Sequence, residues 1–214
     1  MISIKNLTKK YDNKIVFNNL NLDIEENKIT IILGESGVGK TTLLNVIAGL
    51  TDYDGEVRCE IKPMSYIFRE DRLIPNLTVE ENLKLVIPNV DVNTELEKVG
   101  LQNEAKSYPK TLSAGMSRRV SIARGMAFPS KLILMDEPLI NLDLALKFDL
   151  ISKIKADVKE KEKTAIIVTH DVKEAVLLAD RILVLNKGEI VNEINSINEN
   201  TEQELFDFMV NINK

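Results

Sequence analysis

The chain has 214 residues, of which 44% are hydrophobic, and this suffices for one substantial core or for a core with a small satellite lobe. Its formal net charge of −5 excludes the global positive field that marks many nucleic-acid-binding proteins. Cys59 is the only cysteine, no apolar run approaches the ~18 residues of a membrane span, and residues 1–10 lack a secretory leader pattern. We therefore expect a protein of a reducing, cytoplasmic compartment that binds no nucleic acid.

The first part of the chain alternates short apolar segments with polar turns. The apolar segments cover residues 2–7, 15–22 and 29–33. This pattern predicts an antiparallel β region that leads into a buried strand at 29–33, because this last segment is rich in β-branched residues.

A phosphate-binding loop follows that strand. Residues 34–41 (GESGVGKT) fit the pattern G-x-x-x-x-G-K-[ST], and residues 40–50 predict a helix that ends near Gly49. The glycines let successive backbone N–H groups face one anion, and the helix adds the positive end of its dipole. We expect Lys40 to reach the β- and γ-phosphates and the Thr41 hydroxyl to ligate Mg²⁺. The predicted nucleotide-contacting residues here are Gly34, Glu35, Ser36, Gly37, Val38, Gly39, Lys40, Thr41 and Thr42.

The middle of the chain predicts strands and then helices. Residues 54–68 have a strand pattern, whereas residues 78–128 are mainly helical and lack strand signatures. Thr78 and Glu81 form a capping box at the start of the helical block. Its expected breaks lie near Pro88, Gly100 and Pro109.

Strands and helices alternate again in the last part of the chain. The expected strands cover 131–135, 164–169 and 181–185, the helices 144–163 and 171–179, and a hairpin 186–191. The tail, 198–214, predicts a helix packed through Leu205, Phe206 and Met209. We therefore expect an α/β core and an inserted helical lobe. The core would comprise residues 1–68 and 130–214, and the lobe residues 69–129.

Polar side chains follow two of the predicted strands. Asp136 and Glu137 come directly after one apolar strand, and His170, the only histidine, follows the next. Ligands bind at the carboxyl ends of strands in open α/β sheets, so these side chains should lie together. One carboxylate can hold Mg²⁺ through water, and the other can orient or deprotonate an attacking water. A lone histidine is more often structural than catalytic, but this placement puts it beside Glu137.

Six segments in this order resemble the ATP-binding-cassette (ABC) ATPase family over nearly the whole chain. They are Tyr11 (adenine stacking), 34–42 (Walker A), 112–116 (LSAGM, signature motif), 132–137 (Walker B and catalytic glutamate), 141–143 (D-loop) and 169–170 (switch histidine). The resemblance implies an α/β P-loop NTPase (RecA-like) parallel-sheet core with an N-terminal antiparallel β region and an inserted α-helical lobe.

The same resemblance implies a mechanism. Two copies pair head to tail around two ATP molecules, and Ser113 and Gly115 of one copy contact the γ-phosphate held by the other. The family's pattern also places Asp143 at this site and assigns catalysis to Lys40, Glu137 and His170, with Mg²⁺ held by Thr41 and Asp136. It implies ATP hydrolysis coupled to solute movement through separate transmembrane permease subunits, served indirectly by a substrate-binding protein, at the cytoplasmic face of the membrane.

Residues 66–78 are similar to the corresponding region of nitrate, sulfonate and taurine importer ATPases, which favours an importer. Three positions depart from the family pattern. Arg69 replaces a glutamine that ligates Mg²⁺, and arginine has no acceptor atom. Its side chain either turns outward or meets the γ-phosphate as an extra cation. Ala114 replaces a glycine, which costs little if its φ is negative. Arg118 stands where many relatives have glutamine, and we expect it to be a solvated surface charge.

Other functions remain open on these motifs. The chain could be a soluble ABC ATPase, although those in translation usually carry two cassettes and those in DNA repair carry long coiled coils. It could serve an exporter or an envelope complex. Because of Arg69, it could also be an ATP-driven switch with weak hydrolysis, against which the intact Glu137 and His170 argue.

Overall fold

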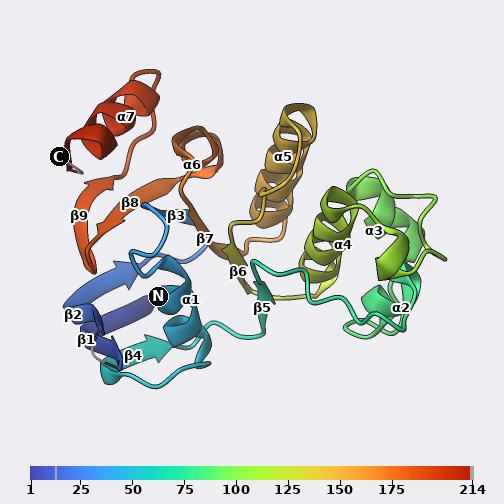
Figure 1. The fold of residues 1–214 in the computed structure, drawn as a ribbon, viewed down its shortest axis with the longest axis horizontal. Coiled ribbons are helices and arrows are strands. Elements are labelled where there is room, and N and C mark those ends of the chain that lie inside the picture. Colours follow the sequence, from blue (N-terminus) through green and yellow to red (C-terminus); the bar gives the residue numbers. More distant parts are fainter. Residues whose placement is uncertain (13, 213–214) are drawn as a thin grey trace.

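The computed structural model describes residues 1–12 and 14–212, which form two sheets and a set of helices around them (Figure 1). The smaller sheet has the strand order β2-β1-β4 and is antiparallel. Its strands are β1 (Ile2–Tyr11), β2 (Lys14–Ile24) and β4 (Asp54–Cys59). The expected antiparallel β region at the N-terminus is therefore confirmed, with longer strands than the apolar segments alone indicated.

The larger sheet has the order β5-β6-β7-β3-β8-β9. Its strands are β3 (Ile29–Leu33), β5 (Met64–Ile67), β6 (Leu132–Asp136), β7 (Thr164–Thr169), β8 (Arg181–Asn186) and β9 (Glu189–Ile194). The first five are parallel, and only β9 runs antiparallel to its neighbour. The carboxyl ends of the parallel strands therefore meet at one edge, as expected for an α/β core.

Each central strand contributes side chains to two cores. In β3, Ile31 and Leu33 belong to one buried cluster, whereas Ile32 belongs to the other. Helix α1 (Lys40–Ala48) and the small sheet cover one face, where Leu43 and Leu44 are fully buried. Helices on the opposite side cover the second face (Figure 1). This two-sided burial explains why the central strands are almost continuously apolar.

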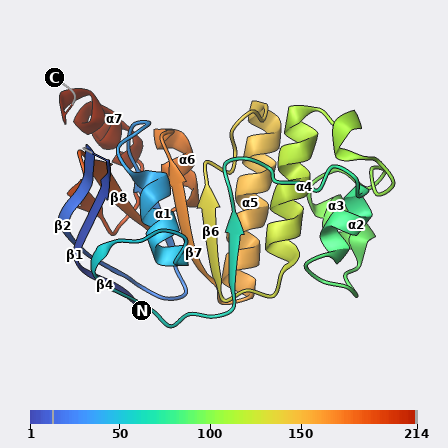
Figure 2. The ribbon, with the colours of Figure 1, turned by 60° about the horizontal axis from the view of Figure 1, so that its bottom comes forward.

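The helical block lies between β5 and β6 in the sequence and projects to one side of the sheet (Figure 2). It contains α2 (Val79–Lys84), α3 (Val92–Lys98), a 3₁₀ turn (Pro109–Thr111) and α4 (Ala114–Ala127). The capping box of Thr78 and Glu81 is present, which confirms the predicted start of α2. None of the helices in the described ranges combines the length and the apolar character that a bilayer span needs.

Two expectations for the C-terminal part need correction. Helix α5 (Leu144–Glu160) ends three residues earlier than expected, because Glu162 adopts a left-handed φ and the Lys163 N–H returns to the Val158 carbonyl. In α7 (Thr201–Ile212) the predicted inward packing of Phe206 is wrong, since this residue is 57% exposed. Leu205 is buried as predicted, α6 (Val172–Leu178) forms as expected, and residues 213–214 of the predicted tail lie outside the described range.

Candidate functional site

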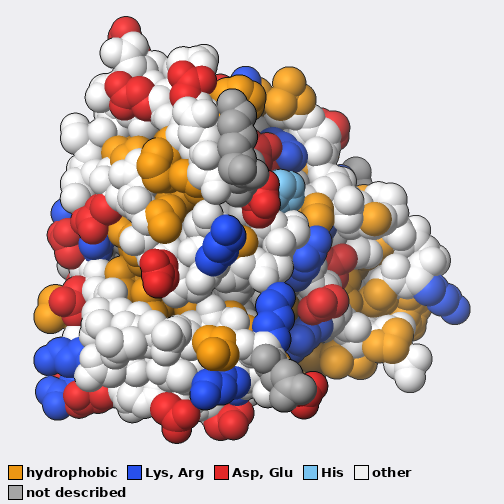
Figure 3. Space-filling model, turned by 60° about the vertical axis from the view of Figure 1, so that its left-hand side comes forward, with side chains coloured by type: hydrophobic (Ala, Val, Ile, Leu, Met, Phe, Trp, Pro, Cys, Tyr) orange, Lys and Arg blue, Asp and Glu red, His pale blue; other side chains and the backbone are white. Residues whose placement is uncertain are grey.

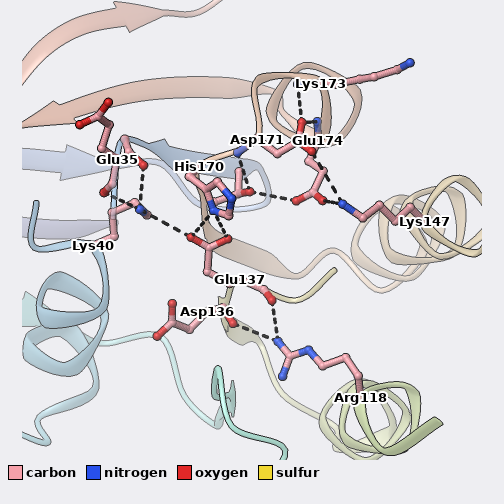
Figure 4. A network of polar contacts seen from close by, with 12 residues as sticks. Glu35, Lys40, Arg118, Asp136, Glu137, Lys147, His170, Asp171, Lys173 and Glu174 are labelled. Carbon is pink, nitrogen blue, oxygen red and sulfur yellow. Dashed lines mark hydrogen bonds and ion pairs between the residues drawn. The ribbon is translucent and has the colours of Figure 1, made fainter. Parts of the chain in front are cut away.

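Four motif segments meet at the carboxyl edge of the parallel sheet. The phosphate loop follows β3, Phe68 and Arg69 follow β5, Glu137 follows β6, and His170 follows β7. Figure 4 shows Lys40, Glu137 and His170 pointing toward one another from three of these segments. The predicted side chains therefore lie together because the strands before them are parallel and adjacent.

The phosphate loop has the backbone geometry of an anion cradle. Gly39 has a φ of 112°, and a Cβ atom there would stand 2.8 Å from a Val16 methyl and 3.0 Å from the Phe17 ring. Gly37 also has a positive φ, of 85°. No side chain of the described residues caps the N-terminus of α1, so its first N–H groups are available to a bound phosphate.

Lys40 is held over this cradle by carbonyl oxygens. Its ammonium group donates to the carbonyls of Gly34 (2.7 Å) and Glu35 (2.9 Å), and it lies 3.6 Å from Oε1 of Glu137. Burial lowers the pKa of Lys40, and the nearby Glu137 carboxylate partly offsets that effect. The cation is thus already positioned where the cradle would hold phosphate oxygens.

Glu137 combines a strained backbone with a buried carboxylate. Its φ is +47°, which side-chain-bearing residues rarely adopt, and it is only 5% exposed. Nδ1 of His170 lies 3.0 Å and 2.9 Å from the two carboxylate oxygens. Because a carboxylate only accepts, Nδ1 is the donor in this contact. The His170 side chain is 52% exposed, and Figure 3 shows this single histidine at the surface.

Asp136 and Thr41 provide hard oxygen donors beside the loop. Burial raises the pKa of Asp136, and a hydrogen bond from the Thr41 side chain lowers it. A hydroxyl and a carboxylate in contact match the oxygen ligands that Mg²⁺ prefers. These two residues therefore fit the metal that the sequence motifs imply.

The cavity above the phosphate loop has a volume of about 230 Å³. Its lining residues are Tyr11, Lys14, Val16, Ser36, Gly37, Gly39, Lys40, Thr41, Thr42, Arg69 and Glu137. Sequence reasoning missed Lys14 and Val16, although both belong to the same β-hairpin as Tyr11. It also missed Lys9, whose ammonium group lies 4.5 Å from the centre of one face of the Tyr11 ring.

Arg69 lies on the cavity side. Its side chain belongs to the cavity lining. Burial lowers the pKa of Lys40 and raises that of Asp136, and the positive charge of Arg69 is a smaller influence that acts downward on both pKa values. Of the two orientations considered from the sequence, this is the one that adds a cation near the phosphate loop.

The signature and D-loop residues stand apart from this cavity. None of the described residues that line it comes from segment 113–115 or from Asp143. Ser113 caps α4 by accepting from the Met116 N–H (3.2 Å), and Asp143 caps α5. A Cβ on Gly115 would lie 3.4 Å from the Asn141 carbonyl, so the two segments adjoin. Ala114 begins α4 with a negative φ, so the methyl group there is tolerated, as expected.

Arg118 is not a solvated surface charge, and that prediction is wrong. It is only 2% exposed, and its guanidinium group donates to backbone carbonyls at the end of β6 and just after β5 and β6. The spacing of the buried residues along α4 could have indicated that Arg118 is buried. Arg118 lies one turn before Ile122 and two turns before Met126, and both are buried on the same stripe of α4.

A second polar network lies behind His170. The Thr169 hydroxyl donates to Oε2 of Glu174 (2.9 Å), and Lys147 Nζ donates to Oε1 of the same carboxylate (2.6 Å). Figure 4 shows this chain of contacts running from the His170 segment to α5. It fixes the loop that carries His170, and no sequence motif had indicated it.

Comparisons with known proteins agree with this geometry. A family model described as ABC transporter matches residues 17–140. An aliphatic sulfonates import ATP-binding protein of Paraburkholderia xenovorans is 40% identical over 194 residues, which is 88% of this chain and 78% of that protein. A spermidine/putrescine import ATP-binding protein of Thermotoga maritima is 37% identical over 89% of this chain and 57% of its own length. A dimeric ATP-binding cassette in a post-hydrolysis state with ADP and Pi superposes with a TM-score of 0.82 at 31% identity, covering 91% of this chain and 98% of that one.

Proposed function

This chain belongs to the ABC transporter family, and on that premise we propose how its own residues bind and hydrolyse ATP. It is the ATP-binding and ATP-hydrolysing subunit of an importer, and it works as a dimer with permease subunits. The observation that carries the residue assignments is the convergence of Lys40, Glu137 and His170 at the end of three parallel strands.

We propose that the nucleotide lies along the cavity from Tyr11 to Lys40. Lys9 covers one face of the Tyr11 ring, so the adenine stacks on the other face. The phosphates meet the N–H groups of the loop and the start of α1, and the Lys40 ammonium exchanges its carbonyl partners for phosphate oxygens. Arg69 adds a second cation toward the γ-phosphate.

Glu137 and His170 act on the attacking water in this proposal. The Glu137 carboxylate accepts from that water and orients it, while His170 holds Glu137 through Nδ1 and faces the γ-phosphate with its half-exposed ring. Lys40 stabilises the negative charge that develops on the transferred group. Mg²⁺ held by Thr41 and Asp136 would neutralise phosphate charge and keep the leaving group in line.

The second copy completes the site. Ser113 and Gly115 lie at the exposed start of α4, outside the cavity of their own chain. We infer that they face the γ-phosphate bound by the partner copy and that Asp143, beside Gly115, accompanies them. This arrangement makes hydrolysis depend on dimer closure.

The permease and a substrate-binding protein select the solute. The relatives carry names for aliphatic sulfonates, which are anions, and for spermidine or putrescine, which are cations, at similar identity to this chain. Because similar ATP-binding subunits serve importers of anions and of cations, we infer that the ATP-binding subunit does not recognise the charge of the solute. We propose that residues 69–129 form the lobe that docks on the permease and that the chain works at the cytoplasmic face.

Purification of the tagged chain from detergent-solubilised membranes tests this function. We expect membrane-spanning subunits to copurify and the complex to hydrolyse MgATP. A Lys40→Met variant should copurify equally and hydrolyse at background rate, because the substitution removes a buried cation of the ATP site and leaves the protein surface unchanged. Recovery of an active wild-type chain without any membrane subunit would contradict the transporter role.

A further inference from the structure

We propose that Arg118 is a positioning residue that holds Glu137 and the loop at Arg69 in their working geometry from the start of the signature helix. This inference deepens the proposed function and rests on the role of Glu137 in hydrolysis. Neither the family motifs nor the comparisons assign any part in hydrolysis to Arg118. From the sequence it was predicted to be a surface charge, whereas the structure buries it.

The guanidinium group of Arg118 is surrounded by the carbonyl oxygens of two strand ends. Nε and Nη2 donate to the last residue of β6 and the segment after it, and Nη1 donates to the segment after β5. The acceptors are the carbonyls of Pro138 (2.8 Å), Asp136 (2.9 Å), Glu137 (2.9 Å), Phe68 (2.6 Å) and Arg69 (3.2 Å). The Asp71 carboxylate, 3.4 Å from Nη1, is the acidic side chain in direct contact.

These contacts surround a strained residue. Glu137 has a left-handed φ, and such a backbone persists only where the surroundings fix it. Its N–H donates to the Val168 carbonyl (3.0 Å), which fixes one side of the peptide chain. Arg118 fixes the other side through the carbonyls of residues 136–138, as Figure 4 shows for Asp136 and Glu137. The direction of the Glu137 carboxylate therefore depends on Arg118.

Arginine suits this position in a way that shorter or simpler side chains do not. Its planar fork presents five N–H donors in fixed directions, so one group can bridge two neighbouring strands. Lysine donates from a single atom, and glutamine has only two N–H donors on a shorter side chain. Neither can reproduce donation to five carbonyls at once, so each leaves buried acceptors without partners.

Arg118 also connects the signature motif to the carboxyl edge of the parallel sheet, where Glu137 lies. It lies on α4, five residues after Ser113, and the same helix begins at the segment proposed to meet the partner's nucleotide. The Arg69 carbonyl is among its acceptors, so the loop that directs the Arg69 side chain into the cavity is held by the same group. A shift of α4 on dimer closure therefore moves Glu137 and Arg69 together.

The test compares Arg118→Lys with Arg124→Lys. Arg124 lies on the same helix and is also partly buried, but it donates to the Asp71 carbonyl (3.0 Å) and to Asn82 (3.4 Å), not to the strand that ends at Asp136. We expect Arg118→Lys to lower kcat about ten-fold or more, with the KM for ATP within about two-fold of wild type. Arg124→Lys should keep both values within about two-fold of wild type. Thermal unfolding and ATP binding, measured on each variant, report whether the fold is intact.

A second variant keeps the test valid if the lysine variant folds poorly. Arg118→Ala leaves space for a free guanidinium ion, and millimolar guanidinium should raise its kcat while leaving Arg124→Ala unchanged. The inference is overturned if Arg118→Lys retains wild-type kcat, if its loss merely follows the loss of folded protein, or if guanidinium does not restore Arg118→Ala. Equal hydrolysis by wild type and Glu137→Gln would instead overturn the role of Glu137 itself, which separates failure of the proposed function from failure of this inference.

Discussion

Nζ of Lys40 lies 3.6 Å from Oε1 of Glu137, so the cation expected to meet phosphate and the carboxylate expected to meet water are paired with each other. Both side chains are buried, which strengthens their attraction relative to a surface pair. A phosphate group that enters the cradle competes with Glu137 for Lys40. Nucleotide binding would thereby free the Glu137 carboxylate from Lys40 and allow it to bind the attacking water. The substrate itself therefore brings Glu137 into its active arrangement.

Arg69→Gln should increase ATP turnover. Arg69 lines the phosphate cavity and brings a charge that cannot coordinate a cation, whereas glutamine offers a carbonyl acceptor. We expect a gain of up to about ten-fold in kcat, which corresponds to about 1.4 kcal/mol in the barrier. Steady-state hydrolysis at saturating MgATP measures it. Arg72→Gln is the control, because Arg72 stacks on the Phe68 ring and is not part of the cavity lining. An unchanged or lower kcat in Arg69→Gln would contradict the inference that Arg69 slows hydrolysis.

Gly39→Ala should abolish nucleotide binding and destabilise the chain. The new methyl would stand 2.8 Å from Val16 and 3.0 Å from Phe17, and the φ of 112° is itself unfavourable for alanine. Gly49→Ala is the matched control, since Gly49 also has a positive φ (71°) but open space around its Cβ position. We expect Gly49→Ala to cost about 1 kcal/mol of unfolding free energy and to keep ATP affinity. Similar ATP affinities in the two variants would contradict the close approach of the hairpin to the loop.

Glu174→Gln should weaken both stability and catalysis. It leaves Lys147 with only the more distant Asp171 carboxylate, 3.7 Å away, as an anionic partner, and it disturbs the acceptor of the Thr169 hydroxyl beside His170. We expect a loss of about 1–3 kcal/mol in unfolding free energy, since this network is buried, together with a lower kcat. Asp149→Asn breaks the exposed pair with Lys153 and should cost under about 1 kcal/mol with kcat unchanged. Denaturant unfolding measures the change in unfolding free energy, and ATPase assays measure kcat. Equal losses of unfolding free energy and of kcat in Glu174→Gln and Asp149→Asn would count against a role for the buried network.

The sequence predicted most of the sheet and the placement of its motifs because these follow from local rules. Apolar β-branched runs define β3 and β7, and parallel strands necessarily bring Glu137 and His170 to one edge. The position of Arg118 could not be derived in the same way. A charged residue is usually exposed, and its burial depends on carbonyls that only the assembled β5 and β6 ends supply.

Side-chain partners from distant elements escaped prediction for a similar reason. Phe206 follows an apolar helical pattern, yet it is exposed because the stripe of α7 that packs on the core runs through Leu205, Met209 and Ile212 instead. Lys14 lines the cavity only because the β1–β2 hairpin approaches the phosphate loop, and Lys9 lies over the Tyr11 ring from the same strand. Lys147 and Glu174, 27 residues apart, meet because α5 and α6 pack together.

We propose that Glu137 activates water in an ATP site that a second copy of the chain completes. The most direct measurement is the mass of Glu137→Gln in solution with and without MgATP, by size exclusion with light scattering, alongside its ATPase rate. We expect a stable ATP-dependent dimer with hydrolysis reduced at least about a hundred-fold. A Glu137→Gln variant that stays monomeric with ATP and hydrolyses it at the wild-type rate would rule out this role of Glu137.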